Sequence, residues 1–174
     1  MPAEIYSYMQ KYGKDLKEVT LCYLLDKSSK KVLIAMKKRG FGAGKLNGVG
    51  GKLKEGETVE QAMLRETKEE ITVDLKEYEK AAVIEFYFKS NPADKNMNQR
   101  AHVFLAYNWK GKPRETEEMD PVWVELDKLP LDRMWEDDRY WLPGILKGRK
   151  IKAAFLFDEN QKITERVVEE VDLL

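Results

Sequence analysis

Apolar residues fall into short runs separated by polar turns, a pattern typical of a chain rich in β-strands. Polar residues 26–31 and 158–161 interrupt the first and last pairs of runs, so both pairs are expected to form hairpins. The predicted strands are residues 19–25, 32–36, 82–88, 101–109, 122–126, 150–157 and 163–171.

Residues 59–71 have the pattern of a helix instead. This segment contains neither Gly nor Pro and is rich in good helix formers. Thr58 followed three residues later by Gln61 fits a capping box, so the helix is expected to begin directly after Thr58. At about 100° per residue, its apolar residues form one stripe. That stripe consists of Val59, Ala62 and Met63.

The remaining segments complete the expected organisation. Residues 39–51 hold six of the eleven glycines and predict a loop of special backbone geometry. Residues 90–99 predict a second loop, and residues 139–146 a helix interrupted near its proline. We find no repeat or interdomain linker, so we expect one α/β or α+β domain over residues 18–174. Residues 1–17 are expected to be an N-terminal extension, with a disordered tail as the default.

Composition narrows the class of protein. Lys+Arg and Asp+Glu are both 31, so no overall field attracts a nucleic acid polymer. Cys22 is the only cysteine and His102 the only histidine, which excludes an intrachain disulfide and argues against a His/Cys zinc site. No apolar run approaches the length of a membrane span, and the first 17 residues lack a signal-peptide pattern. We therefore expect a cytoplasmic protein that does not bind membranes.

Three glutamates on the predicted helix point to its chemistry. Glu66, Glu69 and Glu70 are spaced i, i+3 and i+4, so they share one helix face. Glu66 and Glu70 continue the apolar stripe, whereas a solvated glutamate face would lie opposite it. Inward carboxylates must be protonated, paired or metal-bound. The alternative is a charged, solvated helix, but the spacing favours a site for hard cations and phosphate.

These residues belong to a longer pattern that resembles the Nudix box. Two positions depart from it: Thr67 occupies an apolar slot, and Thr72 stands where Gly is expected at the end of the helix. The resemblance implies the Nudix α/β/α sandwich with a mixed sheet, and dependence on Mg²⁺ or Mn²⁺. The residues on the pattern are Gly51, Glu57, Arg65, Glu66, Glu69, Glu70 and Val73.

The resemblance also implies roles for residues. Glu66, Glu69 and Glu70 would bind metal, and Glu66 or Glu70 would activate water. Arg65 and Glu57 would form an ion pair that steadies the helix and loop, and Lys52 would meet phosphate. The implied metal ligands are Gly50 (by its carbonyl), Glu66, Glu69, Glu70 and Glu118; Glu118 also fits a plain solvated acidic run over residues 115–120.

Two further segments resemble the branch of this family that hydrolyses oxidised purine nucleoside triphosphates. They are residues 36–48 and 134–141, and the resemblance runs from about Thr20 to the C-terminus. It implies that 8-oxo-dGTP, and also 2-hydroxy-dATP, is cleaved to the monophosphate and diphosphate, which cleanses the nucleotide pool and protects DNA. The implied substrate-binding residues are Thr20, Lys37, Phe41, Asn47, Met119, Trp135, Asp137 and Asp138.

The chemistry of these side chains suits a purine. Phe41 and Trp135 offer aromatic walls, and Asn47 offers both a donor and an acceptor. If Asp137 and Asp138 face one pocket, like-charge repulsion should keep one of them protonated, so that the pair presents a donor and an acceptor. Each feature alone also fits a plainer reading, namely core aromatics and a helix start at the two aspartates.

Other assignments stay open at this level. The chain also fits a Nudix hydrolase of dinucleoside polyphosphates, nucleotide sugars or RNA caps, or a Nudix domain that binds nucleotide without catalysis. The second is disfavoured because all the box glutamates are present. We expect a small-molecule nucleotide as the partner and a monomer, with a dimer left open.

Overall fold

The computed structural model describes residues 3–90 and 97–174, so residues 91–96 of the expected 90–99 loop lie outside the described residues. The chain divides into two compact units. The first unit comprises Met1–Val19, Ala81–His102 and Glu136–Leu174, and the second comprises Thr20–Lys80 and Val103–Trp135.

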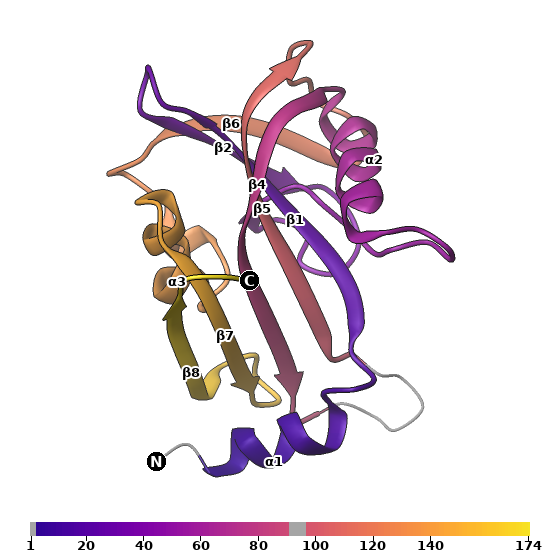
Figure 1. Cartoon of the computed structure of the whole chain (residues 1–174), viewed down its shortest axis with the longest axis vertical. Helices are drawn as coiled ribbons and strands as arrows, with labels where there is room; N and C mark the ends of the chain where they lie inside the picture. The colour runs from indigo at the N-terminus through magenta and orange to yellow at the C-terminus, as the bar shows by residue number, and fades with distance from the viewer. Residues whose placement is uncertain (1–2, 91–96) are drawn as a thin grey trace. The chain divides into compact units, whose positions relative to one another are not determined.

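The described residues form a mixed α/β fold with eight strands and three α-helices, which confirms the expected fold class (Figure 1). The hydrogen-bonded strand order is β3-β2-β1-β5-β4-β7-β8, with β6 paired to β2. The elements are α1 (Ala3–Tyr12), β1 (Lys17–Asp26), β2 (Lys31–Lys37), β3 (Leu46–Asn47), α2 (Val59–Ile71), β4 (Asp74–Phe88), β5 (Gln99–Lys110), β6 (Met119–Glu125), a 3₁₀ turn (Leu131–Arg133), α3 (Asp138–Leu146), β7 (Lys150–Phe157) and β8 (Ile163–Val171).

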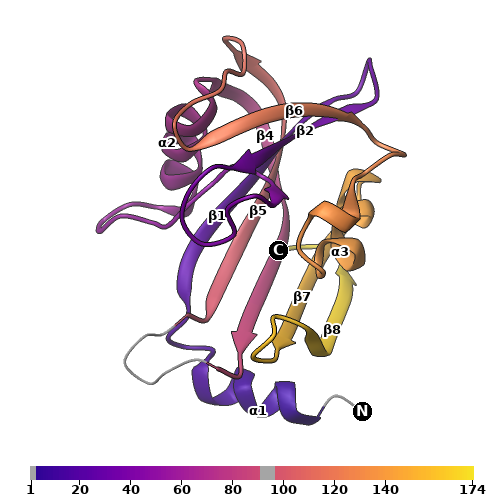
Figure 2. The same ribbon diagram turned by 180° about the vertical axis from the view of Figure 1, so that it is seen from behind.

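The second unit packs α2 against strands. β1 and β2 form the expected antiparallel hairpin, and β6 runs antiparallel beside β2 in both views (Figures 1 and 2). Met63 and Ile71 of α2 are fully buried in one cluster with strand residues that include Leu24 and Phe104. Burial of this apolar stripe holds the helix on the sheet, because each fully buried large side chain contributes about 1.5–3 kcal/mol.

Local contacts set both ends of α2. The Thr58 side chain accepts from the Gln61 N–H and the Gln61 side chain accepts from the Thr58 N–H, which confirms the predicted capping box. Thr72 ends the helix in the left-handed region at φ 65°, where the Nudix pattern has Gly. Thr67 tolerates its apolar slot because its hydroxyl donates to the Met63 carbonyl.

The first unit has helices on opposite faces of its strands. β4 and β7 are parallel, and β7 and β8 form the expected antiparallel hairpin. On one face, the Tyr140 ring of α3 contacts Phe155 of β7, with ring centroids 6.1 Å apart. On the other face, Ile5 of α1 is buried against Ala154 and Leu156. Side chains alternate along β7, so the two helices cover its two faces.

Helix α1 corrects the expectation of a disordered tail. Ile5 is fully buried, and the Glu165 carboxylate of β8 accepts from the backbone N–H of Ile5 at 2.8 Å. A carboxylate at a helix N-terminus satisfies an otherwise unpaired donor and complements the helix dipole. Lys89 adds an ion pair to Glu4 at 2.7 Å. The apolar residues Ile5, Tyr8, Met9 and Tyr12 have helical spacing and pack into one cluster, so the helix has a local signal, whereas its partners on β7 and β8 come from distant parts of the sequence.

Other elements also differ from expectation, and β6 begins at Met119 rather than at residue 122. β4 begins at Asp74 rather than at residue 82, because its polar first half is a strand that exposes alternate side chains. α3 continues through Pro143 without the expected interruption. No helix within residues 3–90 and 97–174 is long and apolar enough to cross a membrane.

Candidate active site

The three glutamates of α2 differ in their exposure. Glu70 is buried, with 4% of its surface exposed. The Glu66 side chain is 14% exposed, and that of Glu69 is 51% exposed. The helix therefore presents one buried, one mostly buried and one open carboxylate along the predicted face.

The Gly50–Gly51 loop lies directly against these carboxylates. The Gly50 N–H donates to Glu70 Oε2 at 3.1 Å. A Cβ on Gly51 would lie 2.6 Å from the Glu66 carboxyl carbon, and a Cβ on Gly50 would lie 1.8 Å from the Thr20 carbonyl oxygen. The Thr20 N–H donates to the Gly51 carbonyl at 2.9 Å and holds the loop to β1. Gly50 therefore requires Gly because a Cβ there would overlap the backbone of Thr20, whereas a Cβ on Gly51 would displace the Glu66 side chain.

The buried carboxyl has altered acidity. Burial raises the pKa of Glu70 to about 8, partly opposed by the Gly50 N–H, while the nearby carboxylates of Glu66 and Glu118 raise it further and Lys37 lowers it. A buried carboxyl surrounded by other carboxylates is the kind of group that a cation stabilises in its charged form.

Arg65 bonds three carboxylates around this face of the helix. Its Nε donates to Glu57 Oε1 at 2.6 Å and its Nη2 to Glu57 Oε2 at 2.9 Å, which is the expected ion pair in bidentate form. The bonds from Arg65 and the Lys54 backbone lower the pKa of Glu57 to about 2. Arg65 Nη1 also donates to Glu66 at 2.7 Å and to Glu69 at 3.2 Å. The sequence did not indicate this second role.

The donor chemistry fits a divalent cation. The side chains that would hold it are carboxylates, and Mg²⁺ prefers carboxylate, carbonyl and water oxygens. In the described part of the chain, no group of three or more His, Cys, Asp or Glu side chains is placed to share an ion. Glu66 and Glu69 bond Arg65 in this structure. The residues that would hold the ion are Glu66, Glu69, Glu70, Glu118 and the Gly50 carbonyl.

Glu118 reaches this region from outside the box. Its carboxylate pairs with Arg39 at 3.2 Å, and its backbone carbonyl accepts from the Lys38 N–H at 2.9 Å. The hydroxyl of Thr116 donates to the Glu70 carbonyl at 2.8 Å and accepts from the Glu118 N–H at 3.3 Å. Thr116 therefore ties the C-terminal turn of α2 to the acidic turn, a contact that the sequence did not predict.

The glycine-rich loop carries an aromatic pair. Gly40, Gly42 and Gly44 all have positive φ, between 80° and 87°, which allows the chain to coil tightly. Phe41 stacks on Trp135 with ring centroids 5.3 Å apart, and the Lys45 ammonium lies 4.9 Å from the Trp135 centroid. The rings contact each other and form one stacked pair; their role as aromatic walls for a purine stays a prediction.

Asn47 is held in a defined orientation. Its Oδ1 accepts from the Tyr23 hydroxyl at 3.0 Å and from the Gly48 N–H at 2.8 Å. A backbone N–H only donates, so the atom facing Gly48 must be the oxygen. The expected acceptor of Asn47 is thus already engaged, and its NH₂ group supplies the remaining donors. Tyr23 is a positioning residue that the sequence did not indicate.

The remaining expected residues fall into different settings. Thr20 is 1% exposed and holds the Gly50–Gly51 loop, and Met119 is 4% exposed within the core cluster. Lys37 lies opposite Met119 in the β2–β6 pairing. Asp137 and Asp138 belong to the first unit, whereas Asn47 and Trp135 belong to the second. A shared base-binding role for these four residues stays a prediction.

The two aspartates are both nearly fully buried at the start of α3. Asp137 Oδ2 accepts from Trp141 Nε1 at 2.8 Å. Burial raises the pKa of Asp137 to about 6, the bond from Trp141 lowers it, and the nearby Glu136 charge raises it. The expected rise in pKa thus occurs at Asp137, but burial rather than repulsion by Asp138 is its main cause.

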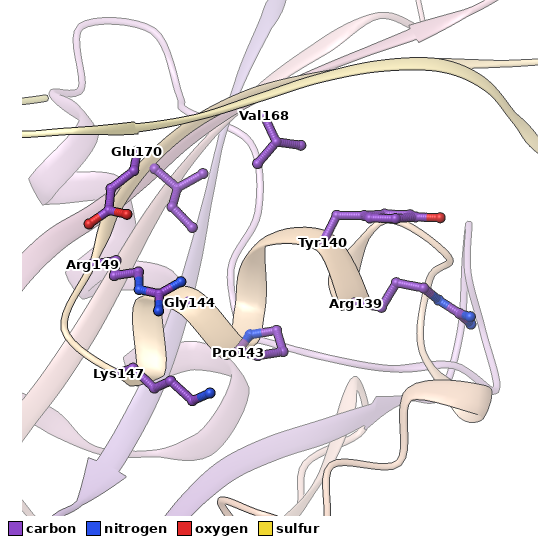
Figure 3. A pocket seen from close by; sticks show the side chains of 9 residues that line it. Arg139, Tyr140, Pro143, Gly144, Lys147, Arg149, Val168 and Glu170 are labelled. Carbon is purple, nitrogen blue, oxygen red and sulfur yellow. The ribbon is translucent and has the colours of Figure 1, made fainter.

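A separate hollow of about 260 Å³ lies in the first unit between α3 and β8 (Figure 3). Arg139 and Arg149 lie at its opposite ends, so their charges do not converge on one point (Figure 3). None of the expected site residues lines this hollow. The residues that line it are Arg139, Tyr140, Pro143, Gly144, Lys147, Arg149, Ile151, Val168 and Glu170.

Comparisons with known proteins show the family to which the chain belongs. The NUDIX domain matches residues 15–145. The chain is 41% identical over 142 residues to proteins named oxidized purine nucleoside triphosphate hydrolase from Danio rerio and from Mus musculus, covering 82% of this chain and 88% of each of those proteins. The chain belongs to the NUDIX family of hydrolases, whose members generally use divalent metal ions.

Solved structures show the same fold. A MutT protein from Bacillus halodurans superposes with a TM-score of 0.75 at 22% identity, over 88% of this chain and 98% of that one. A MutT NUDIX hydrolase from Burkholderia pseudomallei superposes with a TM-score of 0.57 at 27% identity, over 67% of this chain and 88% of that one. Helix α1 (Ala3–Tyr12) precedes the matched NUDIX region.

Proposed function

We propose that this chain hydrolyses oxidised purine nucleoside triphosphates, 8-oxo-dGTP and 2-hydroxy-dATP among them, to the monophosphate and diphosphate. The ion that we assign is Mg²⁺, with Mn²⁺ as a substitute. The observation that carries the proposal is the contact of the α2 carboxylates with the Gly50–Gly51 loop, in which the buried Glu70 accepts from the Gly50 N–H at 3.1 Å. The 41% identity to hydrolases of that name supports the substrate class.

The residues of α2 divide the work of such a reaction. Phosphoryl chemistry depends mainly on positioning and on electrostatic stabilisation. A divalent ion held by the carboxylates supplies charge compensation at the phosphate oxygens and acidifies water. Glu66 or Glu70 accepts the proton of the attacking water. Both carboxylates lie on the inward face of α2, where Glu70 is 4% exposed and the Glu66 side chain is 14% exposed.

The neighbouring cations have supporting roles. Arg65 keeps α2 and the preceding loop together through Glu57 and through the Lys52 carbonyl, 3.2 Å away. Lys37 and Lys52 are assigned to the phosphate chain of the substrate.

The base is assigned to a second group of residues. With its oxygen engaged by Tyr23 and Gly48, Asn47 offers its NH₂ to an acceptor on the purine. Asp137 and Asp138 are assigned to the edge that changes on oxidation, where N7 becomes a donor. The stacked Phe41–Trp135 pair offers an aromatic surface for the base plane.

A panel of substrates tests the proposal. 8-oxo-dGTP, 2-hydroxy-dATP, dGTP, ADP-ribose and a dinucleoside tetraphosphate are incubated separately with Mg²⁺, and the products are separated by anion exchange. We expect the oxidised triphosphates to be cleaved at least tenfold more efficiently than the others, the gain that about 1.4 kcal/mol of selective binding gives, with diphosphate as the second product. Preferred cleavage of ADP-ribose or of the tetraphosphate would contradict the substrate assignment.

A further inference from the structure

The outer edge of β8 has features of a self-association surface. β8 ends the strand order, so one side of it has no strand partner within the described residues. Its pairing with β7 is regular from Glu165 to Val171 and shifts register between Leu156 and Phe157, opposite the start of β8. The regular edge is therefore seven residues long, and its midpoint is Val168. Unpaired strand edges of this length are ready templates for another chain.

The charges on this edge are arranged symmetrically. Arg166, Val168 and Glu170 alternate along β8 and therefore share one face, the face on which Arg166 lies 4.1 Å over the Tyr140 ring of α3. Val168 and Glu170 line the hollow beside α3 (Figure 3). Val168 is one of the exposed large apolar side chains, at 38%. Across residues 3–90 and 97–174, neither Arg166 nor Glu170 has an ion-pair partner.

We propose that two copies of this chain associate through antiparallel pairing of their β8 edges, with Val168 of one copy opposite Val168 of the other. In this register, Arg166 of each copy faces Glu170 of its partner, because both lie two residues from the axis. The two unpaired charges of each copy thus become two cross-strand ion pairs, and the exposed Val168 side chains cover each other. This inference is independent of the substrate proposal.

Charge selects this register over its neighbours. Outward-facing backbone groups alternate along a strand, so two identical edges pair only when some residue lies opposite its own copy. Like charges directly opposite are destabilising. An axis at Val167 places Glu165 opposite Glu169 twice, and axes at Arg166, Glu169 or Glu170 place each of these charged residues opposite itself. Within the regular run, the axis at Val168 alone gives opposite charges and no like-charged pair.

A charge-reversal cycle tests the pairing. Sedimentation velocity is measured over a range of protein concentrations for the wild type, R166E, E170R and the double variant R166E/E170R. We expect a concentration-dependent dimer in the wild type, a dissociation constant raised about tenfold or more in each single variant, and recovery in the double variant, since two pairs are reversed and then restored. Thermal melts that match the wild type show that the variants fold.

A cysteine pair tests the register directly. Cys22 is 1% exposed and does not compete, so V168C carries the accessible thiol. Directly opposed residues lie within disulfide reach, whereas V171C would be six positions out of register with its own copy. Under mild oxidation we expect V168C to form a covalent dimer and V171C to stay monomeric. A wild type that sediments as a monomer at all concentrations, single variants that dimerise as the wild type does, or faster cross-linking of V171C would each overturn the proposal.

Discussion

Replacement of Glu70 by Gln separates the stability of the protein from its activity. The pKa of Glu70 rises from 4.5 in the unfolded chain to about 8 in the fold, chiefly by burial. The fold therefore binds the proton more tightly than the unfolded chain does. Below pH 4.5 the carboxyl is protonated in both states, so its burial does not lower the free energy of unfolding. As the pH rises from 4.5 towards 8, the unfolded chain ionises and the fold does not, so the free energy of unfolding falls.

The size of the effect follows from that shift. At pH 7 the interval above the unfolded value is about 2.5 pH units, which corresponds to roughly 3.5 kcal/mol at 1.4 kcal/mol per unit. Solvent screens part of the electrostatic penalty on the Glu70 carboxylate, and the side-chain amide introduced in E70Q bonds the Gly50 loop less well. Together these effects reduce the expected difference to about 2 kcal/mol. With chelator present, E70Q is expected to be more stable than the wild type at pH 7 by this amount, or by about 5 °C in Tm, while its turnover is almost abolished.

Chemical denaturation with chelator at pH 5 and pH 8 checks this prediction, together with steady-state turnover in Mg²⁺. The difference between E70Q and the wild type should be small at pH 5 and larger at pH 8. E69Q is the matched control, because it neutralises an exposed carboxylate one position away and should change stability by less than about 0.5 kcal/mol. A gap that is absent at pH 8 or independent of pH would refute the burial argument, and E70Q with normal kcat would remove Glu70 from the mechanism.

Three further predictions concern the same sites. G51A should lower kcat by about tenfold or more with little change in Tm, because its Cβ displaces the flexible Glu66 carboxyl that lies 2.6 Å away rather than the backbone; steady-state kinetics with thermal melts check this. Y23F should raise KM for 8-oxo-dGTP about fivefold at constant kcat, since Asn47 loses a bond of about 1 kcal/mol; equal KM values would contradict this positioning role. D137N should gain stability relative to the wild type as the pH rises from about 4 to 7, because the pKa of Asp137 is raised to about 6; parallel denaturation curves at both pH values would count against it.

Local sequence patterns predicted most of the helices and strands. The ends of α2 follow from Thr58, Gln61 and the run of helix formers between residues 59 and 71, and all of these contacts are local. The β7–β8 hairpin has the predicted bounds because its strands alternate around a polar turn. Elements that depend on distant partners were missed. The Glu165 contact that orders α1 leaves no signal in residues 1–17, although the helical spacing of Ile5, Tyr8, Met9 and Tyr12 is itself visible in the sequence.

In the candidate site, too, local spacing was predictive and contacts with distant residues were not. Spacing on one helix was enough to place Glu66 and Glu70 on the inward face. Spacing does not reveal which groups each carboxylate bonds, so the contacts of Arg65 with Glu66 and Glu69 were not foreseen. The Tyr23–Asn47 bond also joins residues 24 positions apart along the chain. Such contacts depend on strand register, which single-sequence patterns do not encode.

The central claim is that the α2 carboxylates and the Gly50–Gly51 loop hold a divalent ion. Anomalous diffraction from crystals soaked in Mn²⁺ tests it most directly. The account predicts an anomalous peak within about 2.0–2.6 Å of carboxylate oxygens of Glu66 and Glu70, the range of metal–oxygen bonds, and its loss in E70Q crystals. Ordered Glu66 and Glu70 side chains without a peak between them, in crystals that retain hydrolytic activity with Mn²⁺, would contradict it.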